Sequence, residues 1–209
     1  MKKNIYKNNK KNLFDKYLEE IDCQKVLSNA YESIRDGYKK SRDYIANNPY
    51  EFLRKSSVSD KYHSMIVAEF CKKTEADFNM STRIFRFTAS NMVYFLLDNK
   101  VLFCFKAIDE RDKIGNRDSK RHRNVMSGDP VFMNKKVVEI LTKRGIIKQP
   151  PIYYFGYHLP KNRELSIKCV RYENNEVAFS LDLREIFFKK EGIKLVIKNN
   201  YAKNKKKVV

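Results

Sequence analysis

The stretch MVYFLLDNKVLFCFKA, residues 92–107, decides the fold class of this chain. Two runs of apolar and aromatic residues, 92–97 and 101–107, flank the tripeptide DNK at 98–100. Asp and Asn tolerate the backbone angles of a tight turn, so this pattern predicts a β-hairpin. A third run of the same kind lies just upstream, at 84–87. We therefore expect these strands to form an antiparallel meander.

The residues before this meander have helical periodicity. Apolar residues recur at helical spacing over 13–46, with Lys, Glu and Asp between them. Pro49 disfavours helical conformation at the preceding residue, so we expect one long helix or two to end there. Ser59 and Asp60 are candidate N-caps for the next helix. The first third of the chain is thus predicted to be a helical layer.

The chain after the meander contains a polar segment, a helix and more strands. Residues 109–130 are basic with few apolar anchors and predict a long loop, whereas 131–143 predict a helix that Gly145 caps. Further strands are predicted at 152–159, 165–172, 177–181 and 193–197, with a hairpin turn at 173–176. Gly156, inside the first of these strands, indicates a bulge or a close approach of the backbone.

These segments predict an α+β fold: an N-terminal helical layer packed on a mostly antiparallel meander sheet with one inserted helix. A chain of 209 residues is long enough for one substantial core. We expect a single domain over 13–198, helical over 13–75 and sheet-rich over 82–198, with the basic loop at 109–130. Residues 1–12 and 199–209 are mostly Lys and Asn and are predicted to be basic tails.

The charge of the chain points to a polyanionic partner. It has 44 Lys and Arg against 25 Asp and Glu, a net charge of +19. Basic proteins gain affinity for nucleic acid by releasing counterions from phosphates, so nucleic acid is the expected partner. The candidate binding residues are Arg111, Lys113, Arg117, Lys120, Arg121 and Arg123. The alternatives are a solvated charged loop, and Lys and Asn enrichment that reflects an A/T-rich genome.

Tyr154 lies in an aromatic run, 153–157, that predicts a stacking surface for unpaired bases. Alternation along a strand places Tyr153, Phe155 and Tyr157 on one face and Tyr154 with His158 on the other. One of these faces must belong to the core. The alternative for the whole run is therefore ordinary sheet packing, which aromatic residues favour in strands.

Candidate catalytic residues gather where the second hairpin strand ends. Asp109 and Glu110 are candidate ligands for Mg²⁺, and Lys106 is a candidate for stabilising charge on a phosphate. With these roles the protein would be a nuclease. His122, among arginines, is a candidate general acid or base. The alternative is a solvated loop with weak local ion pairs. The acid-x-Lys triplet of the common restriction-type nuclease core is absent.

Other motifs narrow the class of protein. The four cysteines form no C-x-x-C pair and the three histidines are scattered, so no zinc-binding spacing is present. No glycine-rich phosphate loop is found. No apolar run approaches the ~18 residues of a membrane span, and the start of the chain lacks the apolar region of a signal peptide. We expect a cytoplasmic protein with reduced thiols, no membrane partner and no cofactor, except Mg²⁺ if it is a nuclease.

The stretches 101–116 and 153–183 resemble a family of uncharacterised small bacterial proteins. Phe105, Lys106, Ile108 and Asp109 match that family's F-K-x-I/L-D strand end. Asn116 and Arg117 fall in its following loop, Gly156 and Tyr157 match its later G-Y strand, and the helix with Tyr62, His63 and Met65 resembles the helix before its sheet. Ala107 and Phe179 depart from the pattern, which has Lys and Trp there. The resemblance implies a toxin or effector of a toxin-antitoxin or phage-defence locus, and assigns no catalytic residue.

The sequence therefore predicts an intracellular nucleic-acid-binding effector, the toxin or effector component of a bacterial toxin-antitoxin or phage-defence module. Its predicted partners are nucleic acid and either a protein antitoxin or a second copy. Two alternatives remain open. One is a non-catalytic interaction or oligomeric structural protein whose N-terminal helices dock a partner, and the other is a metal-dependent nuclease.

Overall fold

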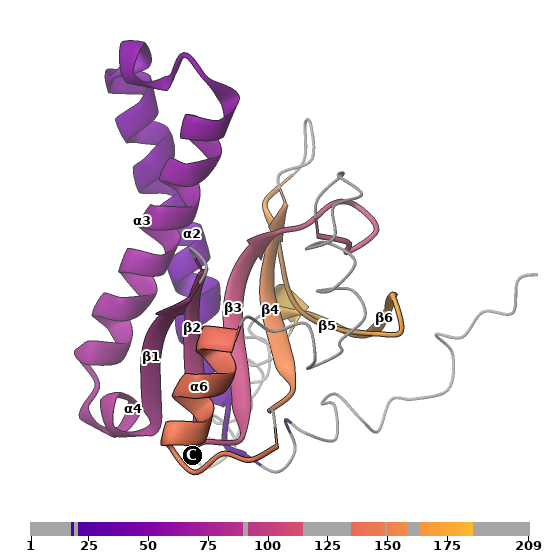
Figure 1. The fold of residues 1–209 in the computed structure, drawn as a ribbon. Helices are drawn as coiled ribbons and strands as arrows, with labels where there is room; N and C mark the ends of the chain where they lie inside the picture. Colours follow the sequence, from indigo (N-terminus) through magenta and orange to yellow (C-terminus); the bar gives the residue numbers. More distant parts are fainter. Residues whose placement is uncertain are drawn as a thin grey trace, which may run out of the picture.

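The computed structural model of the chain describes residues 18, 21–89, 92–114, 135–148, 150–158 and 164–185. Figure 1 shows a pair of long helices on one face of a six-stranded sheet and a shorter helix on the other face. We call the face covered by the two long helices the hairpin face, and the face covered by the shorter helix the crossover face. This architecture confirms the predicted α+β fold with an N-terminal helical layer and one inserted helix. The tails 1–12 and 199–209 and the predicted strand 193–197 lie outside the described residues.

The helical hairpin consists of α2 (Gln24–Asn47) and α3 (Lys55–Glu75), joined by the 3₁₀ turn η2 (Pro49–Phe52). The break at Pro49 confirms the prediction. The predicted cap of the second helix at Ser59 or Asp60 is wrong, because α3 begins earlier, at Lys55. The start of α3 has no side-chain cap, so a search for capping residues cannot detect it. The two helices approach closely at Gly37, where a Cβ atom would lie 2.7 Å from the Cα of Ile66.

The sheet has the order β1-β2-β3-β4-β5-β6. All neighbouring strands are antiparallel except β3 and β4, which are parallel. The strands are β1 (Ile84–Ala89), β2 (Met92–Leu97), β3 (Val101–Ala107), β4 (Ile152–His158), β5 (Ser166–Glu173) and β6 (Glu176–Asp182). A short helix that the sequence did not predict, α4 (Phe78–Arg83), leads into β1, and α6 (Lys135–Lys143) lies between β3 and β4. Residues 131–134 of the predicted inserted helix lie outside the described part.

The two hairpin turns and the C-terminal cap of α6 form at the residues that the sequence predicts. Asn174 and Asn175 have φ of 53° and 66°, as the two-residue turn between β5 and β6 requires, and Asp98 and Asn99, in the three-residue connection between β2 and β3, have φ of 50° and 57°. Gly145 follows α6 with φ of 75°, and its N–H donates to the carbonyl of Thr142, so it is the predicted C-terminal cap. Turn chemistry is local, which is why these predictions are confirmed.

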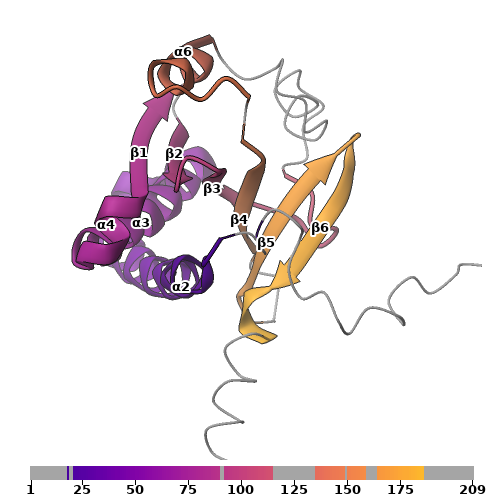
Figure 2. The ribbon, with the colours of Figure 1, turned by 90° about the horizontal axis from the view of Figure 1, so that it is seen from below.

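The core has two parts, one on each face of the sheet. On the hairpin face, Phe70 of α3 packs edge-on against Phe95 and Phe105, with ring centroids 4.8 and 5.1 Å apart. On the crossover face, Val137 and Leu141 of α6 are buried among residues of β1, β2 and β3. Figure 2 views the molecule from below and shows the sheet between these two helical elements. The central strands are therefore covered on both faces.

The described cysteines are mostly part of this core. Cys23, Cys104 and Cys169 are buried, whereas Cys71 is partly exposed. Burial raises the pKa of Cys23 to about 11, so its thiol stays protonated and unreactive at neutral pH. Among the helices that the structure describes, none combines the length and the apolar character needed to cross a membrane.

One carboxylate ties the two helices of the hairpin together. Glu69 of α3 is 7% exposed and accepts hydrogen bonds from Lys40 Nζ of α2 at 2.8 Å and from Lys72 Nζ at 3.4 Å. The hydrogen bond from Lys40 is the main cause that lowers the pKa of Glu69, against the opposing effect of burial. The ionised form of Glu69 therefore stabilises the fold.

This lowered pKa predicts how stability depends on pH. Glu69 contributes stability above its unfolded-state pKa, about 4.3, and loses it as the pH falls through the lower folded-state pKa. We expect Glu69→Gln to reduce the free energy of unfolding at neutral pH by about 1 kcal/mol, since Lys40 is half exposed, and to remove part of the decline in acid. Urea unfolding between about pH 3 and pH 7 measures both effects. Glu176→Gln, at the exposed first residue of β6, is the control, and equal pH profiles for both variants would contradict the assignment.

Candidate functional site

The loop that follows β3 is built around Asp109. Its Oδ1 atom accepts hydrogen bonds from the backbone N–H groups of Arg111 and Lys113, both at 2.8 Å. The Asp109 N–H donates in turn to the carbonyl of Lys113 at 2.8 Å, and Asp112 has a positive φ of 60°. These bonds form a compact turn in which the carboxylate of Asp109 organises the backbone.

Asp112 anchors this turn to the crossover face of the sheet. Its carboxylate accepts hydrogen bonds from Lys168 Nζ of β5 at 2.5 Å and from Ser180 Oγ of β6 at 2.9 Å. Its carbonyl accepts a third bond from the hydroxyl of Tyr172. The side chains of Asp112 and Lys168 are only 17% and 25% exposed, so this ion pair is better shielded from water than a typical surface pair.

A glycine makes room for the start of the same loop. Ile108 follows β3 and is 5% exposed, and its side chain lies over Gly156 of β4. A Cβ atom at Gly156 would lie 2.5 Å from Ile108 Cδ1. Gly156 therefore marks a close approach, as predicted, but the approaching group is a side chain and β4 has no bulge there.

The structure brings together some of the predicted catalytic residues. Lys106 lies at the end of β3 on the crossover face, and Asp109 and Glu110 follow it in the turn. The Asp109 carboxylate is held by backbone N–H groups and Glu110 is exposed. Within the described ranges, no three Asp, Glu, His or Cys side chains are grouped to hold a metal ion. The geometry thus gives Asp109 a structural role, and its catalytic role stays a prediction.

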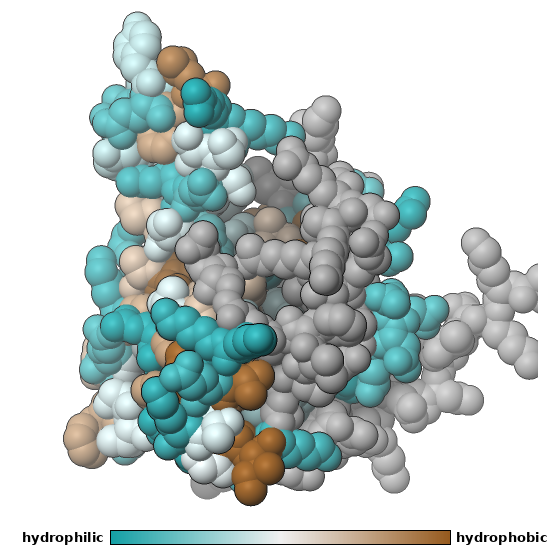
Figure 3. Space-filling model, viewed as in Figure 1, coloured by the Kyte–Doolittle hydropathy of each residue, from teal (hydrophilic) through white to brown (hydrophobic). Residues whose placement is uncertain are grey.

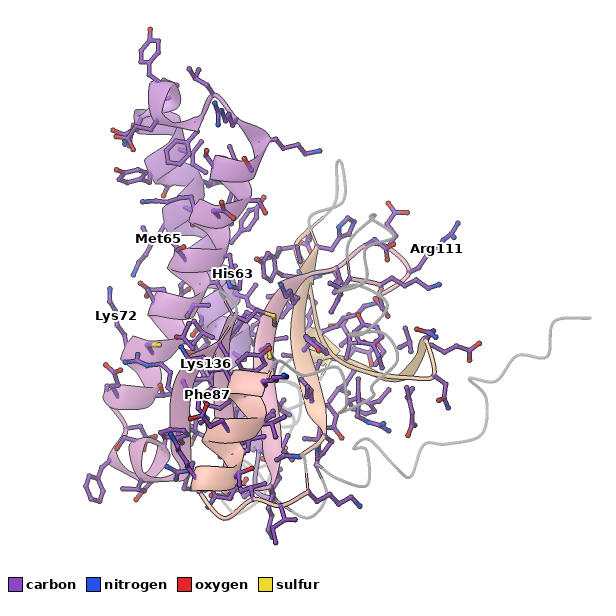
Figure 4. The ribbon with its side chains drawn as sticks, in the orientation of Figure 1. His63, Met65, Lys72, Phe87, Arg111 and Lys136 are labelled. Carbon is purple, nitrogen blue, oxygen red and sulfur yellow. The ribbon has the colours of Figure 1, made fainter. Side chains whose placement is uncertain are left out.

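The predicted binding residues divide in the same way. Arg111 and Lys113 are exposed, and Figure 4 shows Arg111 projecting away from the sheet. Tyr154 is only 4% exposed and its ring packs 5.5 Å from that of Tyr172, so in this structure it belongs to the core and has no open stacking face. The remaining predicted residues lie outside the described part of the chain: Arg117, Lys120, Arg121, His122 and Arg123.

His63 of α3 approaches the same end of β3 from the hairpin face. Figure 4 shows it on the side of α3 nearer the sheet. Burial is the main cause that lowers the pKa of His63, followed by the positive charge of Lys106, with a smaller opposing effect of Asp60. The imidazole is therefore neutral at pH 7. Periodicity could not reveal this approach, because the two residues come from different layers.

The outer side of α6 is basic, a feature that was not predicted from the sequence. Residues 135–148 carry Lys135, Lys136, Lys143, Arg144 and Lys148, all exposed. Their one acidic residue, Glu139, pairs with Lys143 at 2.7 Å. Figure 3 shows hydrophilic residues over this face, interrupted by apolar ones, and Val138 and Ile147 are 46% and 99% exposed. In the sequence, the lysines repeated on the side of the helix opposite Val137 and Leu141 could have indicated this basic side.

Most of the net charge lies outside the described residues. Those residues include 24 of the 44 Lys and Arg and 19 of the 25 Asp and Glu, so they carry +5 of the total +19. The remaining +14 belongs to the other segments, including 115–134, which joins the Asp109 turn to α6. Segment 115–134 has four Lys or Arg against two Asp, a net of +2, and the exposed residues Arg111 and Lys113 and the exposed side of α6 lie at its two ends. We call the turn 109–114 and residues 135–148 the basic surface.

No family model, no curated protein and no solved structure matches this chain. The bacterial family suggested by the sequence resemblance therefore stays a prediction.

The contact between Ile108 and Gly156 predicts non-additive mutations. Gly156→Ala should destabilise the fold by about 1–3 kcal/mol, because the new methyl group overlaps Ile108. Ile108→Ala should cost about 2–5 kcal/mol by leaving a cavity. The double variant should be less destabilised than the sum of the two, since the new methyl group occupies part of the vacated space. Denaturant unfolding of the four proteins measures this coupling, and strict additivity would rule out the contact.

Proposed function

We propose that this protein is a nucleic-acid-binding effector that binds phosphates through the basic surface on the crossover face. The observation that carries the proposal is the concentration of positive charge along α6 and the residues after it: residues 135–148 carry a net +4 in 14 residues, whereas residues 24–75 of the helical hairpin carry +3 in 52. In the helical hairpin, buried or half-buried carboxylates compensate lysines: Lys40 pairs with Glu69, and Lys73 pairs with Glu32 at 3.0 Å and Asp36 at 3.3 Å. Around α6, five basic residues face a single acid.

The proposed mode of binding is contact with the sugar-phosphate backbone. The large aromatic side chains that are highly exposed in the described part of the chain are Tyr50 and Phe78, and neither belongs to the basic surface. Stacking on unpaired bases therefore has no support from these residues, whereas lysine and arginine suit phosphates. Binding of this kind depends little on sequence and strongly on salt.

The proposed biological role is that of the toxin or effector component of a bacterial toxin-antitoxin or phage-defence module. It rests on the sequence resemblance and agrees with a basic protein that acts on nucleic acid. Arg117, Arg121 and Arg123, in the segment between the turn and α6, would add to the charge of the basic surface.

Two matched triple variants test the binding surface. We expect Lys135→Gln, Lys143→Gln and Lys148→Gln together to weaken binding to duplex DNA, and to reduce the slope of log affinity against log salt by up to about 0.9 per lost phosphate contact. The control triple, Lys39→Gln, Arg54→Gln and Lys55→Gln, removes the same charge from exposed residues of the helical hairpin and should leave the slope nearly unchanged. Fluorescence anisotropy at several salt concentrations measures the slopes. Equal losses in both triples would show that net charge alone drives binding.

The same complexes separate a binding effector from a nuclease. We expect DNA and structured RNA strands to be retained and to stay intact with Mg²⁺, because backbone N–H groups already occupy one oxygen of Asp109. Metal-dependent shortening of the strands by the parent protein would instead establish the nuclease alternative.

A further inference from the structure

Strand β1 forms one edge of the described sheet, and some of its backbone hydrogen-bonding groups point away from β2. The register of β1 and β2 begins with Ile84 opposite Leu97, and just before it the Asp98 N–H donates to the Arg83 carbonyl at 3.0 Å. Bonded and non-bonded pairs alternate in antiparallel strands, so the N–H and C=O groups of Arg86 and Thr88 point away from β2. These groups have no partner among the described residues. Among the described elements, Figure 2 shows no helix or strand beyond β1.

A cavity of about 200 Å³ opens at the same edge, between β1 and the helices of the hairpin face. Its lining combines apolar and polar side chains: Ile84, Arg86 and Phe95 from the sheet, Cys71, Thr74 and Glu75 from α3, and Ser81 from α4. Glu75 and Arg86 form an ion pair at 3.0 Å, with side chains 64% and 51% exposed, so this pair is accessible to solvent. The open edge and the cavity are independent features that meet at Arg86.

An extended peptide uses both features when it adds to a sheet edge. Its backbone pairs with the outward N–H and C=O groups, and every second side chain enters a pocket on one face. We propose that the edge of β1 binds an extended segment of a partner protein as an additional strand, with one apolar side chain of that segment in the cavity beside Ile84 and Phe95.

The charges around the edge favour an acidic segment. Arg144 lies over the ring of Phe85 of β1 at 3.9 Å. Arg86 is also exposed at this edge and pairs with Glu75, so these charges are two basic and one acidic. A second copy is a poor occupant, since two chains of +19 repel each other.

The two edges of the sheet differ in how they resist strand addition. Proteins protect free edges with bulges, prolines and inward charges. The β5–β6 pair at the far edge has an irregular register between Arg171 and Tyr172, whereas β1 pairs with β2 without interruption and contains no proline. The edge of β1 is thus regular enough to take a straight partner strand.

The test uses a fluorescein-labelled peptide of about ten residues that alternates glutamate with valine or leucine. We expect saturable binding to the full chain that Thr88→Pro weakens by at least about tenfold, because proline lacks the outward N–H and adds bulk at the edge. Since this N–H points away from β2, the substitution removes no bond of the sheet. Thr88→Val keeps the N–H and should bind within about twofold of the parent. Circular dichroism verifies that each variant folds.

Three further arms separate strand addition from non-specific adsorption of the peptide. The peptide N-methylated at alternate residues should not bind, because it cannot pair with an edge. A peptide with lysine in place of glutamate should bind more weakly. Ser81→Trp places a large side chain in the cavity and should also weaken binding of the peptide. This variant replaces Thr88→Pro in the test if Thr88→Pro does not fold.

Several results would overturn the proposal. The proposal is wrong if the peptide does not bind at concentrations up to about 1 mM, or if the N-methylated peptide binds equally well. It is also wrong if the Thr88→Pro and Thr88→Val variants bind the peptide with equal affinity. A dimer in analytical ultracentrifugation that Thr88→Pro abolishes would show that the occupant is a second copy.

Discussion

Strands β3 and β4 are parallel, and a parallel pair cannot be joined by a hairpin. The chain must leave the sheet at the end of β3, cross one of its faces and return at the start of β4. The helical hairpin already covers one face, packing Phe70 against Phe95 and Phe105, so the crossing segment uses the other. The placement of α6, the Asp109 turn and the basic surface all follow from this pairing.

The crossing segment is fixed at the points where it meets the sheet. Ile108 occupies the space left by Gly156, and Asp112 binds Lys168 and Ser180 on the next two strands. At the other end, Val137 and Leu141 bury one side of α6 and leave its lysines exposed. Three of the four acidic side chains in the described part of the crossing segment have structural partners: Asp109 organises its turn, Asp112 binds Lys168 of β5 and Glu139 pairs with Lys143. The exposed side chains that remain are mostly basic, with Glu110 as the acidic exception.

Local patterns predicted the elements of this fold well and their spatial relations poorly. The hairpins around Asp98 and Asn174 and the cap at Gly145 are encoded by turn residues and were predicted correctly. The parallel pairing of β3 and β4 was missed, although both strands are long apolar runs of the kind that sheets bury on both faces. In the candidate site, the loop carboxylates could be found in the sequence. Their hydrogen bonds to backbone groups, to Lys168 and to Ser180 depend on which strands lie beneath the loop, and no spacing along the chain encodes that.

Hydrogen exchange of the full chain with and without duplex DNA tests most directly whether the crossover face binds nucleic acid. Slowed exchange of backbone amides on binding reports which segments the ligand covers or stabilises. We expect new protection in residues 108–114 and 135–148, with little change in α2 and α3. Protection confined to the helical hairpin, or unchanged exchange in both crossover segments while DNA is bound, would contradict binding at the crossover face.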